Sequence, residues 1–207
     1  MENDATENKA MLCGSIDGTI SLSHLSRGKR YYTFPLRVAR LSGTDDVLNV
    51  ICGEELLAAL EPDGSPMVRV EGELRSYNNK SGVGNKLVIF VYALSVTLCA
   101  DLPENEVTLR GTICKQPCSR VTPMGREICD LLVAVNRPYG HSDYLPCIAW
   151  GQNARMAAGF QVGERIAIEG RIQSRNYIKT VNGEMEHRTA YEVSSSSVEK
   201  LQPSLRA

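Results

Sequence analysis

The feature that most constrains the fold of this 207-residue chain is an internal repeat. Three blocks match in the same order: MLCGSI at 11–16 with TLRGTI at 108–113, residues 47–53 with 145–151, and VRVEGELRS at 68–76 with IAIEGRIQS at 166–174. The offset between the copies changes by one residue after the first block. A chain that carries one unit twice has to fold as two similar domains.

Each copy is predicted to consist mainly of strands. In the second copy, Val107, Leu109 and Ile113 alternate with polar residues, which indicates a half-buried strand. Further strands are expected at 128–136, 144–150, 165–178 and 189–193, with a helix at 152–158. The first copy repeats this order, with strands at 12–23, 34–41, 47–52, 67–77 and 87–96 and a helix at 54–60.

Local signals support this order. The sequence predicts a turn at 123–125, a bulge or sharp bend at Gly170 and a hairpin at Asn182-Gly183. The fold class is therefore all-β, with two tandem OB-fold Greek-key barrels. Each barrel has five strands and a short helix between strands three and four.

The repeat also sets the expected domain boundaries. We expect a disordered tail at 1–8, a first OB-fold domain at 9–100, a linker at 101–104, a second OB-fold domain at 105–195 and a C-terminal tail at 196–207.

Composition limits the function classes. The net charge is −1, which argues mildly against a nucleic-acid-binding protein, although local charge decides binding more than the net balance does. No apolar run reaches the roughly 20 residues of a membrane helix, and the start of the chain is acidic and polar. The seven cysteines are an odd number, which favours a reducing compartment. We therefore expect a cytoplasmic protein with no membrane contact.

The second copy resembles the bacterial single-stranded DNA-binding protein family. The segments that carry the resemblance are NEVTLRG at 105–111, LVAVNR at 132–137, IAWGQNA at 148–154, GERIAIEGRIQSRNY at 163–177 and TAYEV at 189–193. The resemblance implies binding of single-stranded DNA without sequence specificity, in DNA replication, repair or recombination. It also implies that the chain is not an enzyme and needs no cofactor.

The resemblance assigns candidate binding residues in the second copy. Bases would stack on four aromatic residues, Tyr139, Tyr144, Trp150 and Tyr177. Contact with the phosphates needs cations, and Arg137, Arg171, Arg175 and Lys179 are the candidates because they lie near these aromatics in the sequence. A core position is expected for Tyr191 instead. Alternation alone does not decide which face of the 144–150 strand meets solvent.

The second copy also departs from the family pattern. The family often has basic residues where this chain has Gln152 and Val162, which implies weaker binding and a shallower dependence on salt. A family His at the subunit contact is Leu145 here. The family typically assembles four barrels, a number that two copies per chain would reach as a homodimer. The acidic C-terminal tail through which many members recruit other proteins is not expected.

The first copy is expected to be a degenerate DNA site. In the repeat alignment Tyr144 corresponds to Asp46, Trp150 to Cys52 and Tyr177 to Asn79, so the aromatic set is missing. Tentative contacts in this copy are Arg75, Tyr77, Lys80 and Lys86. These differences suggest that the second copy binds DNA while the first is mainly an assembly or extension unit.

Three other classes of function remain open. A zinc site could use Cys114, Cys118, Cys129, His141 and Cys147, although their spacing fits no standard zinc motif. An enzyme is disfavoured because no nucleophile elbow, phosphate loop or dinucleotide fingerprint is present. The main alternative is a protein-interaction or primosome-type assembly module with weak nucleic-acid binding, since OB-folds host many functions.

Overall fold

The computed structural model describes residues 7–58, 60, 67–81, 83–100, 102–181 and 183–202. The chain forms two compact units. The N-terminal unit comprises Lys9–Glu106 and Gln173–Ala190, and the C-terminal unit is built on Val107–Ile172 and on the chain from Tyr191 onward. The boundary of the units thus differs from the boundary of the repeats, because a hairpin of the second copy belongs to the N-terminal unit.

The N-terminal unit contains a closed barrel. Its elements are β1 (Glu7–Ile16), β2 (Ser21–Ser26), β3 (Lys29–Ala39), β4 (Asp45–Gly53), α1 (Glu54–Leu57), β5 (Met67–Asn78) and β6 (Leu87–Leu98). The barrel order is β3-β4-β6-β5-β1, and pairing of β1 with β3 closes it. Among the described residues of this barrel, β4 and β6 pair in parallel and the other neighbouring strands pair antiparallel.

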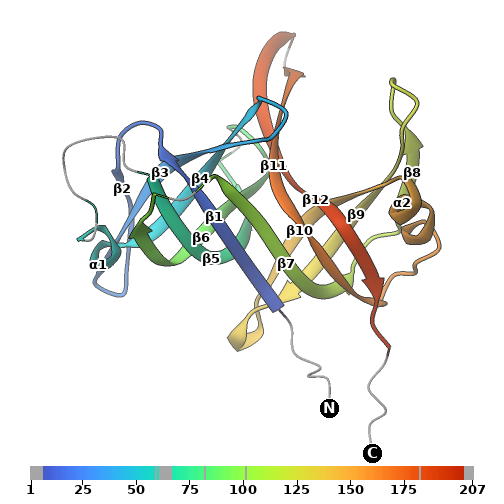
Figure 1. The fold of residues 1–207 in the computed structure, drawn as a ribbon, viewed down its shortest axis with the longest axis horizontal. Coiled ribbons are helices and arrows are strands. Elements are labelled where there is room, and N and C mark those ends of the chain that lie inside the picture. Colours follow the sequence, from blue (N-terminus) through green and yellow to red (C-terminus); the bar gives the residue numbers. More distant parts are fainter. Residues whose placement is uncertain are drawn as a thin grey trace, which may run out of the picture. The chain divides into compact units, whose positions relative to one another are not determined.

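The second copy repeats this connectivity, and the outer part of its last two strands, residues 173–190, belongs to the N-terminal unit. Its elements are β7 (Glu104–Ile113), β8 (Cys118–Val121), β9 (Glu127–Asn136), the 3-10 turn η1 (Pro138–Gly140), β10 (Ser142–Trp150), α2 (Gly151–Ala157), β11 (Arg165–Val181) and β12 (Glu184–Lys200). The order β9-β10-β12-β11-β7 is closed by pairing of β7 with β9. Both copies are therefore five-stranded Greek-key barrels of the OB type, as predicted, and a helix follows the third barrel strand in each (Figure 1).

Alternating apolar residues fill each barrel. Leu12, Leu36 and Val70 are buried in the first copy, and Leu109, Val133 and Ile168 in the second. The glycine at 170 is required by close approach of two strands, because a Cβ there would lie 2.3 Å from the carbonyl oxygen of Ser194. Its counterpart Gly72 lies at a register shift between β5 and β6, which is the kind of bulge expected at a barrel corner.

Some boundaries differ from those expected. Each copy has an additional short strand, β2 or β8, that forms a hairpin arm with the next barrel strand. The helix α1 ends at Leu57 instead of 60, and β12 continues to Lys200, beyond the expected domain end at 195. The expected turn at 123–125 is present, with a hydrogen bond from the Gly125 N–H to the Thr122 carbonyl. Asn182 of the expected hairpin lies outside the described residues, as do 1–6 and 203–207 of the expected tails.

The strand registers correct the repeat alignment in the third barrel strand. Val38 pairs with Asp46 in the first copy, and Val135 pairs with Asp143 in the second. Asp46 is therefore the counterpart of Asp143, and Trp150 is the counterpart of Gly53 rather than of Cys52. The alignment by the shared Gly53 and Gly151 was wrong by one residue, because it matched glycines with different roles: Gly151 has φ +54°, and Gly53 does not have a positive φ.

A buried carboxylate anchors the second-copy hairpin within the N-terminal unit. Asp46 is fully buried and accepts hydrogen bonds from Arg40, with Nε at 2.6 Å. It also accepts hydrogen bonds from the backbone N–H of Ser174 at 2.6 Å and from the Ser174 hydroxyl at 2.9 Å. Arg40 in turn donates to the Ser174 carbonyl at 3.0 Å. These contacts tie β11 to the first copy at Ser174.

Among the described residues, no helix is long and apolar enough to cross a membrane.

Candidate nucleic-acid interface

The side chains of β10 alternate between a face that packs in the barrel core and a face that points outward. Leu145, Cys147 and Ala149 are buried, whereas Tyr144 is 44% exposed and Trp150 is partly exposed. Tyr144 and Trp150 therefore share the outward face, at opposite ends of the strand. At about 3.3 Å per residue, this separation is about 20 Å, which spans several nucleotides of an extended single strand.

The indole of Trp150 is held in a defined orientation. Its Nε1 donates to the Ser194 hydroxyl at 3.0 Å, and Ser194 lies on the neighbouring strand β12. The ring lines an open hollow of about 570 Å³ together with Gly125, Arg126, Glu127, Gly151 and Arg155. An indole with a fixed plane beside an open hollow is suited to stack a flat ring such as a nucleobase.

The acidic groups near Trp150 are neutralised by arginines. Asp130 of β9 accepts two hydrogen bonds from Arg120, at 2.6 and 3.1 Å. Glu127 pairs with Arg155 at 2.5 Å. Within the described part of the chain, Arg126 has no ion-pair partner. Most of the charge on this surface is therefore compensated, and stacking is its main binding feature.

Arg137 has a structural partner that the sequence did not indicate. Its guanidinium pairs with both oxygens of the fully buried Asp143, with Nε at 2.6 Å. This is the counterpart of the Arg40–Asp46 pair in the first copy. A buried carboxylate needs such a partner, so the first task of Arg137 is to compensate the charge of Asp143.

Tyr139 and Arg171 occupy different environments. Tyr139 is 98% exposed on the turn η1 and has φ +70°, a left-handed conformation that projects the ring away from the strands. Arg171 is partly exposed on β11. Tyr191, expected in the core, is partly exposed because it lies near the start of the barrel part of β12, ahead of the buried Val193.

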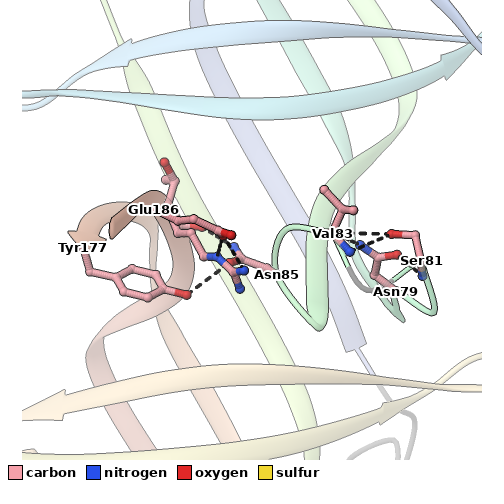
Figure 2. A network of polar contacts seen from close by, with 8 residues as sticks. Asn79, Ser81, Val83, Asn85, Tyr177 and Glu186 are labelled. Atoms are coloured by element: carbon pink, nitrogen blue, oxygen red, sulfur yellow. Dashed lines mark hydrogen bonds and ion pairs between the residues drawn. The ribbon is translucent and has the colours of Figure 1, made fainter. Parts of the chain in front are cut away.

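Tyr177 and Arg175 lie on the hairpin of β11 and β12 that belongs to the N-terminal unit. The Tyr177 hydroxyl donates to the Asn85 side-chain carbonyl at 3.1 Å, and Asn85 also donates to the Thr189 carbonyl. Figure 2 shows the Tyr177 ring pointing toward Asn85. The Arg175 guanidinium lies over the Tyr177 ring, 5.7 Å from its centroid.

A basic hollow lies beside this hairpin. It has a volume of about 340 Å³, and its basic lining residues are Lys80, Lys86, Lys179 and Arg188. Asn79 shapes the adjoining turn, because its side chain accepts from the Ser81 N–H at 2.9 Å and donates to the Val83 carbonyl at 2.7 Å (Figure 2). Three candidates from the sequence, Lys80, Lys86 and Lys179, are thus brought together. Arg188 was missed.

The other first-copy candidates lie on the outward face of β5. Arg75 forms an ion pair with Glu73 and lies over the Tyr92 ring at 5.8 Å. Tyr77 is 52% exposed and contacts Phe90 edge-on, with ring centroids 6.1 Å apart. The alternation in β6 could have indicated Tyr92 and Phe90, because they share parity opposite the buried Val91.

The proposed zinc ligands are not gathered. Among the described residues, no group of three or more His, Cys, Asp or Glu side chains is arranged to hold a metal ion. Cys147 is buried, and burial raises the pKa of its thiol far above the usual range. Burial also raises the pKa of Cys52, to about 11. These thiols are packing residues in the barrels.

The second half of the chain matches a known family. Residues 104–201 match the model of the single-strand binding protein family. Single-stranded DNA-binding protein 2 of Listeria innocua is 35% identical over 106 residues, which are 48% of this chain and 65% of that protein. Single-stranded DNA-binding protein A of Bacillus subtilis is 32% identical over 106 residues, 48% of this chain and 60% of that protein. The chain thus spans less than two thirds of these relatives.

A solved structure resembles both copies. The crystal structure of the single-stranded DNA-binding protein from Thermus aquaticus matches 98% of this chain and 97% of its own, with a TM-score of 0.79 and 19% identity. This similarity supports the tandem OB-type architecture.

Proposed function

Because residues 104–201 belong to the single-strand binding protein family, we propose that this chain binds single-stranded DNA without sequence specificity. Trp150 carries the proposal: its indole is partly exposed, oriented by Ser194 and open to a hollow. Stacking on such a ring tolerates any base, because every base has a π-face. The proposed role is binding alone.

The proposed contacts fall into two groups. Tyr144 and Trp150 stack bases on the outward face of β10, with Tyr139 available on the neighbouring turn. Arg126, which the sequence did not single out, and Arg171 hold phosphates near them, whereas Arg137 supports Asp143. On the β11–β12 hairpin, Tyr177 and Arg175 offer a ring and a cation, and Lys179 extends the basic surface.

The cellular role follows from the same family membership. We infer a role in DNA replication, repair or recombination in the cytoplasm, with association with the nucleoid. Two barrels per chain would give four barrels in a homodimer. The alternative, an assembly module with weak nucleic-acid binding, has less support because the similar relatives carry the name single-stranded DNA-binding protein.

The test uses the single tryptophan of the chain. Oligo-dT is titrated into the protein at low and moderate salt while Trp150 fluorescence is recorded, with duplex DNA as the control. We expect strong quenching by the single strand alone. Unchanged fluorescence together with unchanged anisotropy of labelled oligo-dT would refute the proposal.

Variants refine the test. Trp150→Ala removes one stacked base, worth about 1–3 kcal/mol, and should weaken binding about 5- to 150-fold. Trp150→Phe keeps an aromatic ring and should weaken DNA binding less. Both variants lack the tryptophan, so their binding is measured by the anisotropy of labelled oligo-dT. Val162→Ala, at an exposed loop position, is the matched control and should bind as the parent chain does.

A further inference from the structure

The first copy carries an aromatic cluster on its outer surface. The His24 and Tyr31 rings are stacked, with centroids 4.9 Å apart and an interplanar angle of 6°. Tyr31 also contacts Tyr92, with centroids 6.3 Å apart. The Arg75 guanidinium lies over Tyr92. His24 is exposed, and both tyrosines are partly exposed, so the cluster is not part of the barrel core.

The strand registers place this cluster where the second copy has Trp150. In the second copy, Trp150 pairs across the strands with Ile128, and Ile148 pairs with Ser194, whose hydroxyl holds the indole. In the first copy, the pairs at these positions are Gly53 with Tyr31 and Ile51 with Tyr92. Tyr31 thus replaces Ile128, and Tyr92 replaces Ser194.

The first copy has no side chain at Gly53, the position that corresponds to Trp150, and aromatic residues of the neighbouring strands lie there instead. A Cβ at Gly53 would lie 2.4 Å from the Glu55 carboxylate, so a side chain there would displace Glu55. The rings instead stand on the two adjacent strands, β3 and β6. The aromatic surface is at the same place on both barrels, although different strands carry it. A sequence alignment compares only equivalent positions of the two copies. It therefore cannot detect that the aromatic residues have moved from one strand to its two neighbours.

We propose that His24, Tyr31 and Tyr92, with Arg75, form a second surface that stacks bases of single-stranded DNA. The ligand is the unpaired bases of a strand already bound at Trp150 or of another strand, and the inference rests on the proposed function of the second copy. The face of strands two and three of an OB barrel, with its adjoining hairpin loop, is a general site for oligonucleotides. Tyr31 and His24 lie on the corresponding strand β3 and hairpin arm β2.

The local charges indicate how this surface binds. Arg75 is paired with Glu73, and Arg30 is paired with Glu54 at 3.3 Å. These two guanidinium groups are therefore already compensated, and the exposed cations of the β2–β3 hairpin are Arg27 and Lys29. Binding here should come mainly from stacking, with phosphate contacts from this hairpin adding to it. The first copy, expected to serve mainly assembly, thereby becomes part of the DNA-binding surface.

The test compares the full chain with the double variant Tyr31→Leu/Tyr92→Leu, which keeps apolar bulk and removes both rings. Tyr32→Leu is the matched control, because Tyr32 lies next to Tyr31 in the sequence and its hydroxyl donates to the exposed Glu54 at 3.3 Å. For poly(dT), we expect the double variant to occlude fewer nucleotides per chain and to bind about tenfold or more weakly. Quenching of Trp150 by a short oligo-dT should be unchanged.

Photo-crosslinking gives an independent readout. Oligonucleotides that carry 5-iododeoxyuridine should crosslink to the peptides that contain Tyr31 and Tyr92 as well as to that of Trp150. Crosslinks at Trp150 alone, with an unchanged site size in the double variant, would overturn this inference and leave the proposed function standing. A change of oligomeric state in the double variant without crosslinks would also overturn it, because the cluster would then be a contact between copies. No crosslinks and no quenching would overturn both proposals.

Discussion

Substitution of Asp46 by Asn tests whether the buried carboxylate anchors the second-copy hairpin. Asp46 accepts hydrogen bonds from Arg40 and from both the N–H and the hydroxyl of Ser174. An Asn has the same shape, but it has no charge and turns an amide N–H₂ toward groups that are themselves donors. Breaking a buried ion pair costs about 3–5 kcal/mol. The Arg40 side chain is 21% exposed and can be partly hydrated, so we expect a loss of about 2–4 kcal/mol in the free energy of unfolding.

The pH dependence of this effect has a definite sign. Burial alone would raise the pKa of Asp46, but the hydrogen bonds from Arg40 and Ser174 outweigh it and hold the pKa below the usual 3.8. A carboxyl group whose pKa is depressed in the folded state stabilises the fold fully above its unfolded pKa. That contribution is lost as the pH falls through the folded pKa. The difference in the free energy of unfolding between Asp46→Asn and the parent chain should therefore be constant near neutral pH. It should become smaller below about pH 3.8.

The assay is urea unfolding followed by circular dichroism, with hydrogen exchange of the 173–190 segment. Asp45→Asn is the matched control: Asp45 pairs at 3.1 Å with Arg37, whose side chain is 43% exposed, and such pairs contribute about 0–1 kcal/mol. The hairpin amides should lose protection in Asp46→Asn only. Equal losses of stability in the two variants, or full protection of the Ser174 amide in Asp46→Asn, would refute the anchoring role.

Three other predictions concern single positions. Gly170→Ala should destabilise the C-terminal barrel by about 2–3 kcal/mol in thermal unfolding, because its Cβ would meet the Ser194 carbonyl, whereas Gly159→Ala has ordinary contacts and should be near neutral. Arg126→Ala should reduce the slope of log binding constant against log salt by about 0.7, since one phosphate contact is lost; an unchanged slope would remove Arg126 from the site. Iodoacetamide at pH 8 should label the exposed Cys118 and leave Cys147 unmodified, because burial raises the pKa of Cys147; rapid labelling of Cys147 in the folded protein would contradict its place in the core.

Much of the fold could be predicted from the repeat and its alternation. The alternating apolar residues determine which face of each strand is buried, and Gly170 marks a place where two backbones meet. The register of the third strand could not be predicted, because the matching Gly53 and Gly151 were the stronger signal. Only the cross-strand pairs reveal that Asp46 corresponds to Asp143.

The candidate site was predictable only in part. Trp150 and Tyr144 lie on the same face of β10, as their even spacing in the sequence indicated. The spacing alone did not show that this face, and not the other, is turned to solvent. The role of Arg137 was missed, since a strand sequence does not show which carboxylate is buried beside it. Arg126 and Arg188 were missed because they lie in hairpins, where alternation carries no information about neighbours. The cluster of Tyr31 and Tyr92 depends on pairing between strands that are distant in sequence.

The placement of the 173–190 hairpin in the N-terminal unit affects how the two copies can be separated. A fragment that begins at 104 would keep its own barrel strands but lose Asn85 and Asp46, the partners of Tyr177 and Ser174. A duplicated gene usually yields halves that can be recombined or deleted as modules. In this chain one half supplies the support for an arm of the other, so excision of either half would remove contacts that the remaining half uses. Changes in either half are then selected on the behaviour of the pair.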